Sequence, residues 1–133
     1  LRREDVTIAG CGEPGELWMR SAGVMQGYWN NPEATAETVV DGWLATGDIA
    51  TVDENGIYTI VDRKKSMVIS GGENIYCAEV ERVVASHPAV REAFAYGLPD
   101  SRLGEIVAVD CVIDPGADVD AEAIKAHAKA HLA

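Results

Sequence analysis

The sequence feature that most constrains the fold is a turn signal, Asp53-Glu54-Asn55-Gly56, which separates two β-forming segments. An Asn-Gly pair between two such segments is typical of a β-hairpin, because both residues tolerate the positive φ of tight hairpin turns. Residues 49–52 and 57–61 are therefore predicted to be paired strands. A two-stranded hairpin alone is only marginally stable in water, so this one must pack on further structure.

One strand and one helix are expected before the hairpin. Residues 15–20 alternate as a strand does. The run Asn31-Pro32-Glu33 indicates a helix start, with an asparagine cap, a proline at the first position and an acidic side chain near the positive end of the dipole. This helix is predicted to reach about Val40 and to stop at Asp41-Gly42. Around residues 6–8 the sequence fits either an edge strand or a loose lead-in.

A second group of elements is expected from Met67 onward. The predicted order is strand, helix, strand, strand, helix, which indicates an α+β layer with helices on one face of a sheet. The expected ranges are strand 67–69, loop 70–74, helix 78–86, strands 90–98 and 105–113 joined by a Pro99-Asp100 turn, and a last helix capped by Asp118 or Asp120. In helix 78–86, Val80, Val83 and Val84 should face inward, and Glu79, Glu81 and Arg82 should face water.

Composition excludes several functional classes. The formal net charge is -11, which argues against nonspecific nucleic-acid binding because a phosphate backbone would be repelled. No apolar run approaches the roughly 20 residues of a transmembrane helix. Three cysteines without a paired spacing fit a reducing cytoplasm. His127 and His131 share a helical face, but the sequence offers no third ligand at a suitable spacing, so no metal site is predicted.

Three further stretches resemble blocks of a known superfamily. They are GELWMRSAGVMQGYWNNPEATAET, the segment from Gly42 to Glu81 with TGD and SGGENIY, and YGLPDSRLGE. Together and in this order they resemble the adenylate-forming superfamily of acyl- and aryl-CoA synthetases, firefly-type luciferases and peptide-synthetase adenylation domains. The resemblance implies an α+β architecture in which residues 1–64 are the small β-rich end of the large N-terminal AMP-binding domain. Residues 65–133 would then belong to the small mixed α/β C-terminal lid domain.

The same resemblance implies a function for the longer protein. It would be a fatty-acid-like or aryl-like CoA ligase of the cytoplasm that activates a carboxylic acid with ATP, releases AMP and transfers the acyl group to CoA. Mg²⁺ would accompany ATP, and the partner of this chain would be the rest of the N-terminal domain. Two alternatives stay open: an adenylation domain that hands its acyl group to a carrier protein, and a binding module that keeps the lid fold without catalysis.

Two residues resemble the nucleotide-binding positions of this family. Asp48 of TGD would bind the ribose of ATP and AMP, since a carboxylate accepts hydrogen bonds from both ribose hydroxyls. Arg63 would contact ribose oxygens or phosphate through its rigid guanidinium. The plainer alternatives are a turn aspartate for Asp48 and an exposed ion pair from Arg63 to Asp62 or Glu54.

The residues that follow resemble the family's hinge and its CoA-binding loop. Lys65 stands at the hinge position, with an exposed linker lysine as the alternative. Gly71 and Gly72 would line the pantetheine tunnel of CoA, because glycine lets a ligand approach the backbone closely; otherwise they form an ordinary turn. Cys77 departs from the proline that is common in the family after NIY.

The family's catalytic lysine has no counterpart in this sequence. It belongs to a Gly-Lys motif that would lie beyond Ala133, and Lys125 and Lys129 fall within a helical pattern instead. The family's phosphate loop and acyl pocket are also absent from these residues. No catalytic residue is therefore assigned in this chain, and the isolated chain is expected to be inactive although the full-length protein would be an enzyme.

Overall fold

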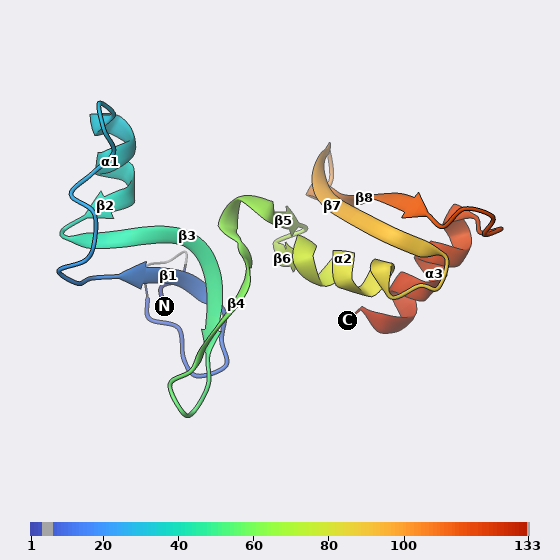
Figure 1. Cartoon of the computed structure of the whole chain (residues 1–133), viewed down its shortest axis with the longest axis horizontal. Helices are drawn as coiled ribbons and strands as arrows, with labels where there is room; N and C mark the ends of the chain where they lie inside the picture. The colour runs from blue at the N-terminus through green and yellow to red at the C-terminus, as the bar shows by residue number, and fades with distance from the viewer. Residues whose placement is uncertain (4–6, 133) are drawn as a thin grey trace. The chain divides into compact units, whose positions relative to one another are not determined.

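The computed structural model describes residues 1–3 and 7–132, and the chain divides into two compact units. The N-terminal unit is Leu1–Lys65 and the C-terminal unit is Ser66–Ala133. Each unit has a four-stranded sheet of its own (Figure 1). The assignment of residues 1–64 and 65–133 to two domains of a larger enzyme stays a prediction.

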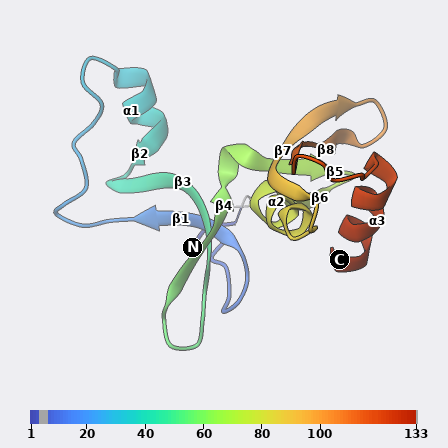
Figure 2. The same cartoon turned by 45° about the vertical axis from the view of Figure 1, so that its right-hand side comes forward.

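The sheet of the N-terminal unit is built around one long strand. β3 (Trp43–Val52) pairs antiparallel with β1 (Gly15–Met19) along one side. On its other side it pairs with β2 (Val39–Val40) near its start and with β4 (Tyr58–Arg63) near its end. The β3–β4 hairpin projects from the sheet, and its turn lies at the far end (Figure 2). The predicted hairpin is confirmed, with longer strands than expected.

The turn of this hairpin is closed by Asp53. Its Oδ1 accepts hydrogen bonds from the backbone amides of Asn55 at 2.9 Å and Ile57 at 2.8 Å. These bonds lower the pKa of Asp53, with the Ile57 amide as the largest cause and a desolvation effect opposing it. The carboxylate is thus part of the turn.

The helix of the N-terminal unit is shorter than expected. α1 spans Pro32–Thr38, and the side chain of Asn31 caps it by accepting from the amide of Ala34 at 3.0 Å. The expectation that it reaches Val40 is wrong, because Val39 and Val40 form β2. Asp41 and Gly42 both have positive φ, 52° and 77°, and close a two-residue hairpin from β2 to β3. Of the strand considered around residues 6–8, residue 6 lies outside the described residues, and Ile8 bridges to Arg2.

The C-terminal unit has the strand order β6-β5-β8-β7, with every pairing antiparallel. The short 3-10 helix η1 (Lys64–Ser66) contains the boundary between the two units. The elements of the C-terminal unit are β5 (Met67–Ser70), β6 (Glu73–Tyr76), α2 (Cys77–Ala85), β7 (Val90–Asp100), β8 (Gly104–Ile113) and α3 (Ala121–His131). The mixed α/β class expected for this half of the chain is confirmed. No helix in the described ranges is long and apolar enough to cross a membrane.

The core of the C-terminal unit lies between α2, α3 and one face of the β7–β8 hairpin. Val80, Val84 and Val90 are its buried centre. Alternate strand residues pack on them from β7 and β8, and Ile124, Ala128 and Leu132 pack on them from α3 and its end. The predicted inner face of α2 is confirmed, since Val80, Val83 and Val84 are all buried.

Three expectations for the C-terminal unit are wrong. Residues 73–76 are strand β6, because a two-residue Gly71-Gly72 turn suffices to reverse the chain. Pro99 and Asp100 pair within β7 opposite Glu105 and Gly104. Proline is tolerated there because β7 is an edge strand, where a missing amide need not break the sheet. Glu81 does not simply face water, since its carboxylate accepts from the backbone amide of Ala95 at 2.9 Å.

The opposite face of the β7–β8 hairpin carries exposed apolar side chains. Phe94 and Tyr96 alternate along β7 with the inward-facing alanines, and Leu98 lies opposite Ile106 of β8. All four are exposed. We call these four residues the outer strip.

Candidate functional site

Asp48 and Arg63 meet across neighbouring strands. They are register partners on β3 and β4, and the Arg63 Nε lies 3.0 Å from Asp48 Oδ1. The Arg63 side chain is 69% exposed and that of Asp48 is 28% exposed, so a solute can reach both. The alternative considered for Arg63 is an ion pair with Asp62 or Glu54. The structure pairs its side chain with Asp48, while Asp62 Oδ1 accepts from the Arg63 backbone amide at 2.6 Å. The structure thus brings the two predicted nucleotide-binding residues together.

Thr46 fixes the backbone position of Asp48. Its hydroxyl donates to the carbonyl oxygen of Leu17 on β1 at 2.8 Å and accepts from the amide of Asp48 at 3.1 Å. The hydroxyl therefore links β1 to the backbone of Asp48. Sequence reasoning did not assign Thr46 a role, although its place two residues before Asp48 in TGD was the available signal.

The three basic residues after Asp62 have different surroundings in the structure. Arg63 pairs with Asp48, and Lys64 Nζ lies 3.0 Å from Glu16 Oε2. Lys65 has no ion-pair partner among residues 1–3 and 7–132. It is exposed, lies in η1 and is the last residue of the N-terminal unit. Its location at the junction of the two units suits a hinge, and the hinge role itself stays a prediction.

Gly71 and Gly72 form the turn between β5 and β6. Their φ angles are 60° and 88°, a region that L side chains rarely adopt. A Cβ on Gly71 would lie 3.2 Å from Leu103, whereas one on Gly72 would meet nothing within 4 Å. The backbone at Gly72 is therefore open to a ligand, and the turn belongs to the C-terminal unit, apart from the unit that holds Asp48 and Arg63.

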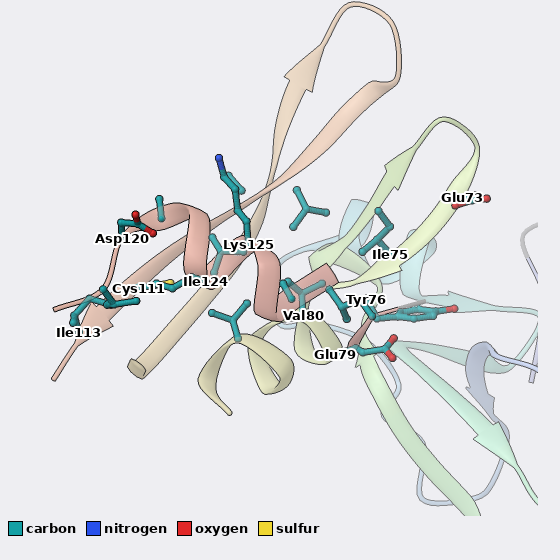
Figure 3. Close-up of a pocket in the computed structure, with 18 of the residues that line it drawn as sticks. Glu73, Ile75, Tyr76, Glu79, Val80, Cys111, Ile113, Asp120, Ile124 and Lys125 are labelled. Carbon is teal, nitrogen blue, oxygen red and sulfur yellow. The ribbon is translucent and has the colours of Figure 1, made fainter. Parts of the chain in front are cut away.

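A cavity of about 830 Å³ lies within the C-terminal unit, between β6, α2, β8 and α3 (Figure 3). Its wall is mainly apolar and includes Ile75, Val80 and Ile124, which also belong to the core of this unit. Glu73 and Asn74, which directly follow the Gly71-Gly72 turn, belong to its lining. The volume falls in the usual range of ligand pockets. Sequence reasoning did not predict this cavity.

The three cysteines are not joined in disulfides, and they lie in different surroundings. Cys11 is exposed, and Cys77, the first residue of α2, is buried at 2% exposure. Cys111 lines the cavity, where burial and, to a lesser degree, the charge of Asp110 raise its thiol pKa. Because the thiolate is the reactive form, the surroundings of Cys111 do not favour nucleophilic chemistry.

The three histidines, scattered in the sequence, meet in the fold. The ring of His127 lies 5.2 Å from that of His87 and 4.4 Å from that of His131, measured between centroids. His127 Nε2 is also 2.9 Å from Ser86 Oγ and 3.1 Å from the carbonyl oxygen of Val83. These contacts fasten α3 to the end of α2. In the part of the chain that the structure describes, no group of three His, Cys, Asp or Glu side chains is arranged to hold a metal ion.

The sequence matches a known family over its C-terminal part. Residues 79–133 match the AMP-binding enzyme C-terminal domain. A long-chain-fatty-acid–CoA ligase of Yersinia pestis is 46% identical over 132 residues, which cover 99% of this chain and 23% of that protein. A feruloyl-CoA synthase of Amycolatopsis is also 46% identical, covering 97% of this chain and 28% of that protein. The chain thus spans about a quarter of the curated relatives that it matches.

Solved structures give the same result. The ATP-bound MatB of Rhodopseudomonas palustris matches with a TM-score of 0.89 and 33% identity over 99% of this chain and 26% of its own. The amide bond synthetase McbA of Marinactinospora thermotolerans matches with a TM-score of 0.86 and 40% identity over 98% of this chain and 26% of its own. These solved structures share the fold of this chain, and the relatives carry different names: two are named for CoA, whereas McbA is named an amide bond synthetase. The chain belongs to the adenylate-forming superfamily and aligns with a C-terminal portion of relatives that are named as acyl-CoA and aryl-CoA ligases.

Proposed function

We propose that the full-length protein is an ATP-dependent, AMP-forming acyl-CoA synthetase of the cytoplasm. The observation that carries this proposal is the 3.0 Å pair of Asp48 and Arg63, at the two positions where the resembled family binds the nucleotide. Support also comes from relatives named as CoA ligases for fatty and aromatic acids.

The reaction has two steps. In the first, a carboxylate oxygen of the acid attacks the α-phosphorus of ATP, an O–P bond forms, and pyrophosphate leaves with the displaced electron pair. In the second, the CoA thiol loses its proton and its sulfur attacks the acyl carbon of acyl-AMP. The C–S bond forms as the C–O bond to phosphate breaks, and AMP leaves.

Asp48 and Arg63 serve the first step. Asp48 accepts hydrogen bonds from the ribose hydroxyls, which places the α-phosphorus at a fixed distance from the acid. Arg63 neutralises Asp48 in the absence of nucleotide, and its remaining guanidinium donors bind ribose or phosphate oxygens. The exposure of the Arg63 side chain, 69%, leaves these donors accessible.

Gly71, Gly72 and Lys65 serve the second step. The open backbone at Gly72 lines the path of the pantetheine arm, where a side chain would obstruct the thiol. Lys65 is the pivot between the units, and a hinge needs only a few residues that absorb a backbone rotation.

Mg²⁺ would accompany ATP, as in a solved complex of MenE from Bacillus subtilis with ATP and a magnesium ion. The described residues of this chain contain no three-residue acidic or histidine cluster for it. Its ligands would come from ATP and from the remainder of the protein, and no step here is assigned to the ion.

The test is a comparison of acyl acceptors with the purified full-length protein. Acid-dependent pyrophosphate release followed by formation of a CoA thioester supports the proposal. If the acyl group is transferred only to a carrier-protein thiol, the acceptor is the carrier protein and CoA is wrong. If it is transferred only to an amine, as the name of McbA suggests for that enzyme, the acceptor is the amine. Absence of acid-dependent pyrophosphate release would leave a binding module that keeps the lid fold without catalysis.

A further inference from the structure

The turn between β5 and β6 is tied to the turn between β7 and β8. The backbone amide of Gly71 donates to the carbonyl oxygen of Leu103 at 2.9 Å, and Ser70 pairs with Gly104. The side chain of Leu103 also reaches the Gly71 position, as a Cβ there would lie 3.2 Å from it. The geometry of Gly71 and Gly72 therefore depends on residues 101–103.

Asp100 fixes this second turn. Its Oδ1 accepts from the backbone amides of Arg102 at 2.9 Å and Leu103 at 2.8 Å. Both bonds lower the pKa of Asp100, the one from Leu103 more, while partial burial opposes them. The carboxylate is therefore ionised at neutral pH and is a strong acceptor. Asp100 holds the amide of Leu103, and Leu103 in turn holds Gly71 by its carbonyl oxygen.

Glu105 braces the same turn from the other side. Its Oε2 accepts from the backbone amide of Ile69 at 3.1 Å, two residues before Gly71. A Cβ on Gly97 would lie 3.0 Å from Glu105 Oε1, so the glycine leaves the space that this carboxylate fills. Asp100 and Glu105 thus hold the Gly71-Gly72 turn through two separate paths.

We propose that Asp100 and Glu105 are positioning residues for the thioester half-reaction, holding the Gly71-Gly72 turn in the form that admits the thiol arm of CoA. This inference rests on the proposed function, in which that turn lines the CoA path. Both carboxylates act through backbone amides of the C-terminal unit, whereas Asp48 and Arg63 belong to the N-terminal unit. Their loss should consequently affect the second half-reaction and spare the first.

The kinetic test uses the full-length enzyme with Asp100→Ala and Glu105→Ala. Acyl-AMP formation and thioester formation from supplied acyl-AMP are measured separately. Each variant should raise the KM for CoA about tenfold, the usual scale of a lost charge-assisted hydrogen bond, with acyl-AMP formation nearly unchanged. Unchanged thioester kinetics, or equal loss in both half-reactions, overturns the proposal.

Conservative variants separate positioning from general stability. Asp100→Asn and Glu105→Gln keep a side-chain oxygen that can accept from the same amides, so they should restore most of the affinity for CoA. An alanine replacement of the exposed Asp118 is the matched control and should change neither half-reaction. If the amide variants behave like the alanine variants, the acceptor role assigned to these oxygens is wrong.

Amide hydrogen exchange gives a readout without activity, on the 133-residue chain. Asp100→Ala should speed exchange at Gly71 about tenfold, and Glu105→Ala should do so at Ile69, with little change in α3. Unaltered exchange at both amides overturns the inference. The variant Gly72→Leu separates a failure of the positioning role from a failure of the proposed CoA path. If Gly72→Leu impairs thioester formation while Asp100→Ala does not, only the positioning role is wrong. If Gly72→Leu spares thioester formation, the proposed CoA path itself is wrong.

Discussion

At the scale of single residues, the Asp48–Arg63 pair can contribute to folding stability or to nucleotide binding, and the two roles predict different effects of mutation. A solvent-exposed ion pair contributes less than about 1 kcal/mol to folding, so its loss should leave stability almost unchanged. A carboxylate that accepts from ribose hydroxyls contributes more to binding, because hydrogen bonds to charged groups are worth about 1.5–3 kcal/mol. The pair is therefore best tested by activity.

We expect Asp48→Ala in the full-length enzyme to slow acyl-AMP formation by about tenfold to a hundredfold. Pyrophosphate release at varied ATP measures the effect. Replacement of the exposed Glu54 in the same hairpin by alanine serves as the control and should leave the rate unchanged. Wild-type kinetics in Asp48→Ala would show that the carboxylate does not bind the nucleotide.

At the scale of secondary-structure elements, the Asp53 turn should give the N-terminal unit a pH dependence. The folded-state pKa of Asp53 is lowered, mainly by the Ile57 amide. Its contribution is therefore complete above its unfolded value of about 3.9 and is lost as pH falls through the folded pKa. Asp53→Ala should lower the melting temperature of this unit at pH 7, and the difference from wild type should shrink in acid.

Tryptophan fluorescence can follow that transition, because Trp18, Trp29 and Trp43 all belong to the N-terminal unit. Asp53→Asn keeps an acceptor oxygen without the charge, and its melting difference from Asp53→Ala should not vary with pH. A wild-type difference from Asp53→Ala that stays constant from pH 7 to strong acid would contradict the assigned role.

Helix α2 carries the packing of the C-terminal unit. Val84 is 2% exposed in the core, and Val84→Ala removes two buried carbon atoms and leaves a void. The expected loss is about 2 kcal/mol in the free energy of unfolding of this unit. Denaturant titration followed by far-UV circular dichroism measures it, and Arg82→Ala on the exposed face should stay within about 0.5 kcal/mol. Equal effects of the two variants would contradict the packing described.

The comparison of sequence and fold shows which signals are local. Asn31 and the Asp53-Gly56 turn act on amides a few residues away, so their elements could be predicted from the chain itself. Val39 and Val40 became a strand because β3 lies opposite them, and this pairing has no local signal beyond Asp41-Gly42. The partner of Arg63 likewise depends on the register between β3 and β4. The candidate residues of the site could therefore be named from the sequence, whereas their contact partners could not.

At the scale of the whole molecule, Lys65 is the residue where the two units join. Lys65→Pro would fix φ near -65° and remove a backbone donor. If the lid needs two positions, one for each half-reaction, this variant should complete acyl-AMP formation and fail in thioester formation from supplied acyl-AMP. Lys65→Ala keeps the backbone freedom and is the control. Normal rates in both half-reactions would mean that the pivot lies elsewhere.

The outer strip has a consequence for the behaviour of the isolated chain in solution. Phe94, Tyr96, Leu98 and Ile106 present apolar surface to water, while a net charge of -11 keeps separate copies apart. Salt shortens the reach of that repulsion to about 8 Å near 0.15 M. Light scattering of the dilute chain should therefore rise as sodium chloride is added, and Phe94→Lys should suppress the rise. The resistance of the isolated chain to association should therefore depend on ionic strength.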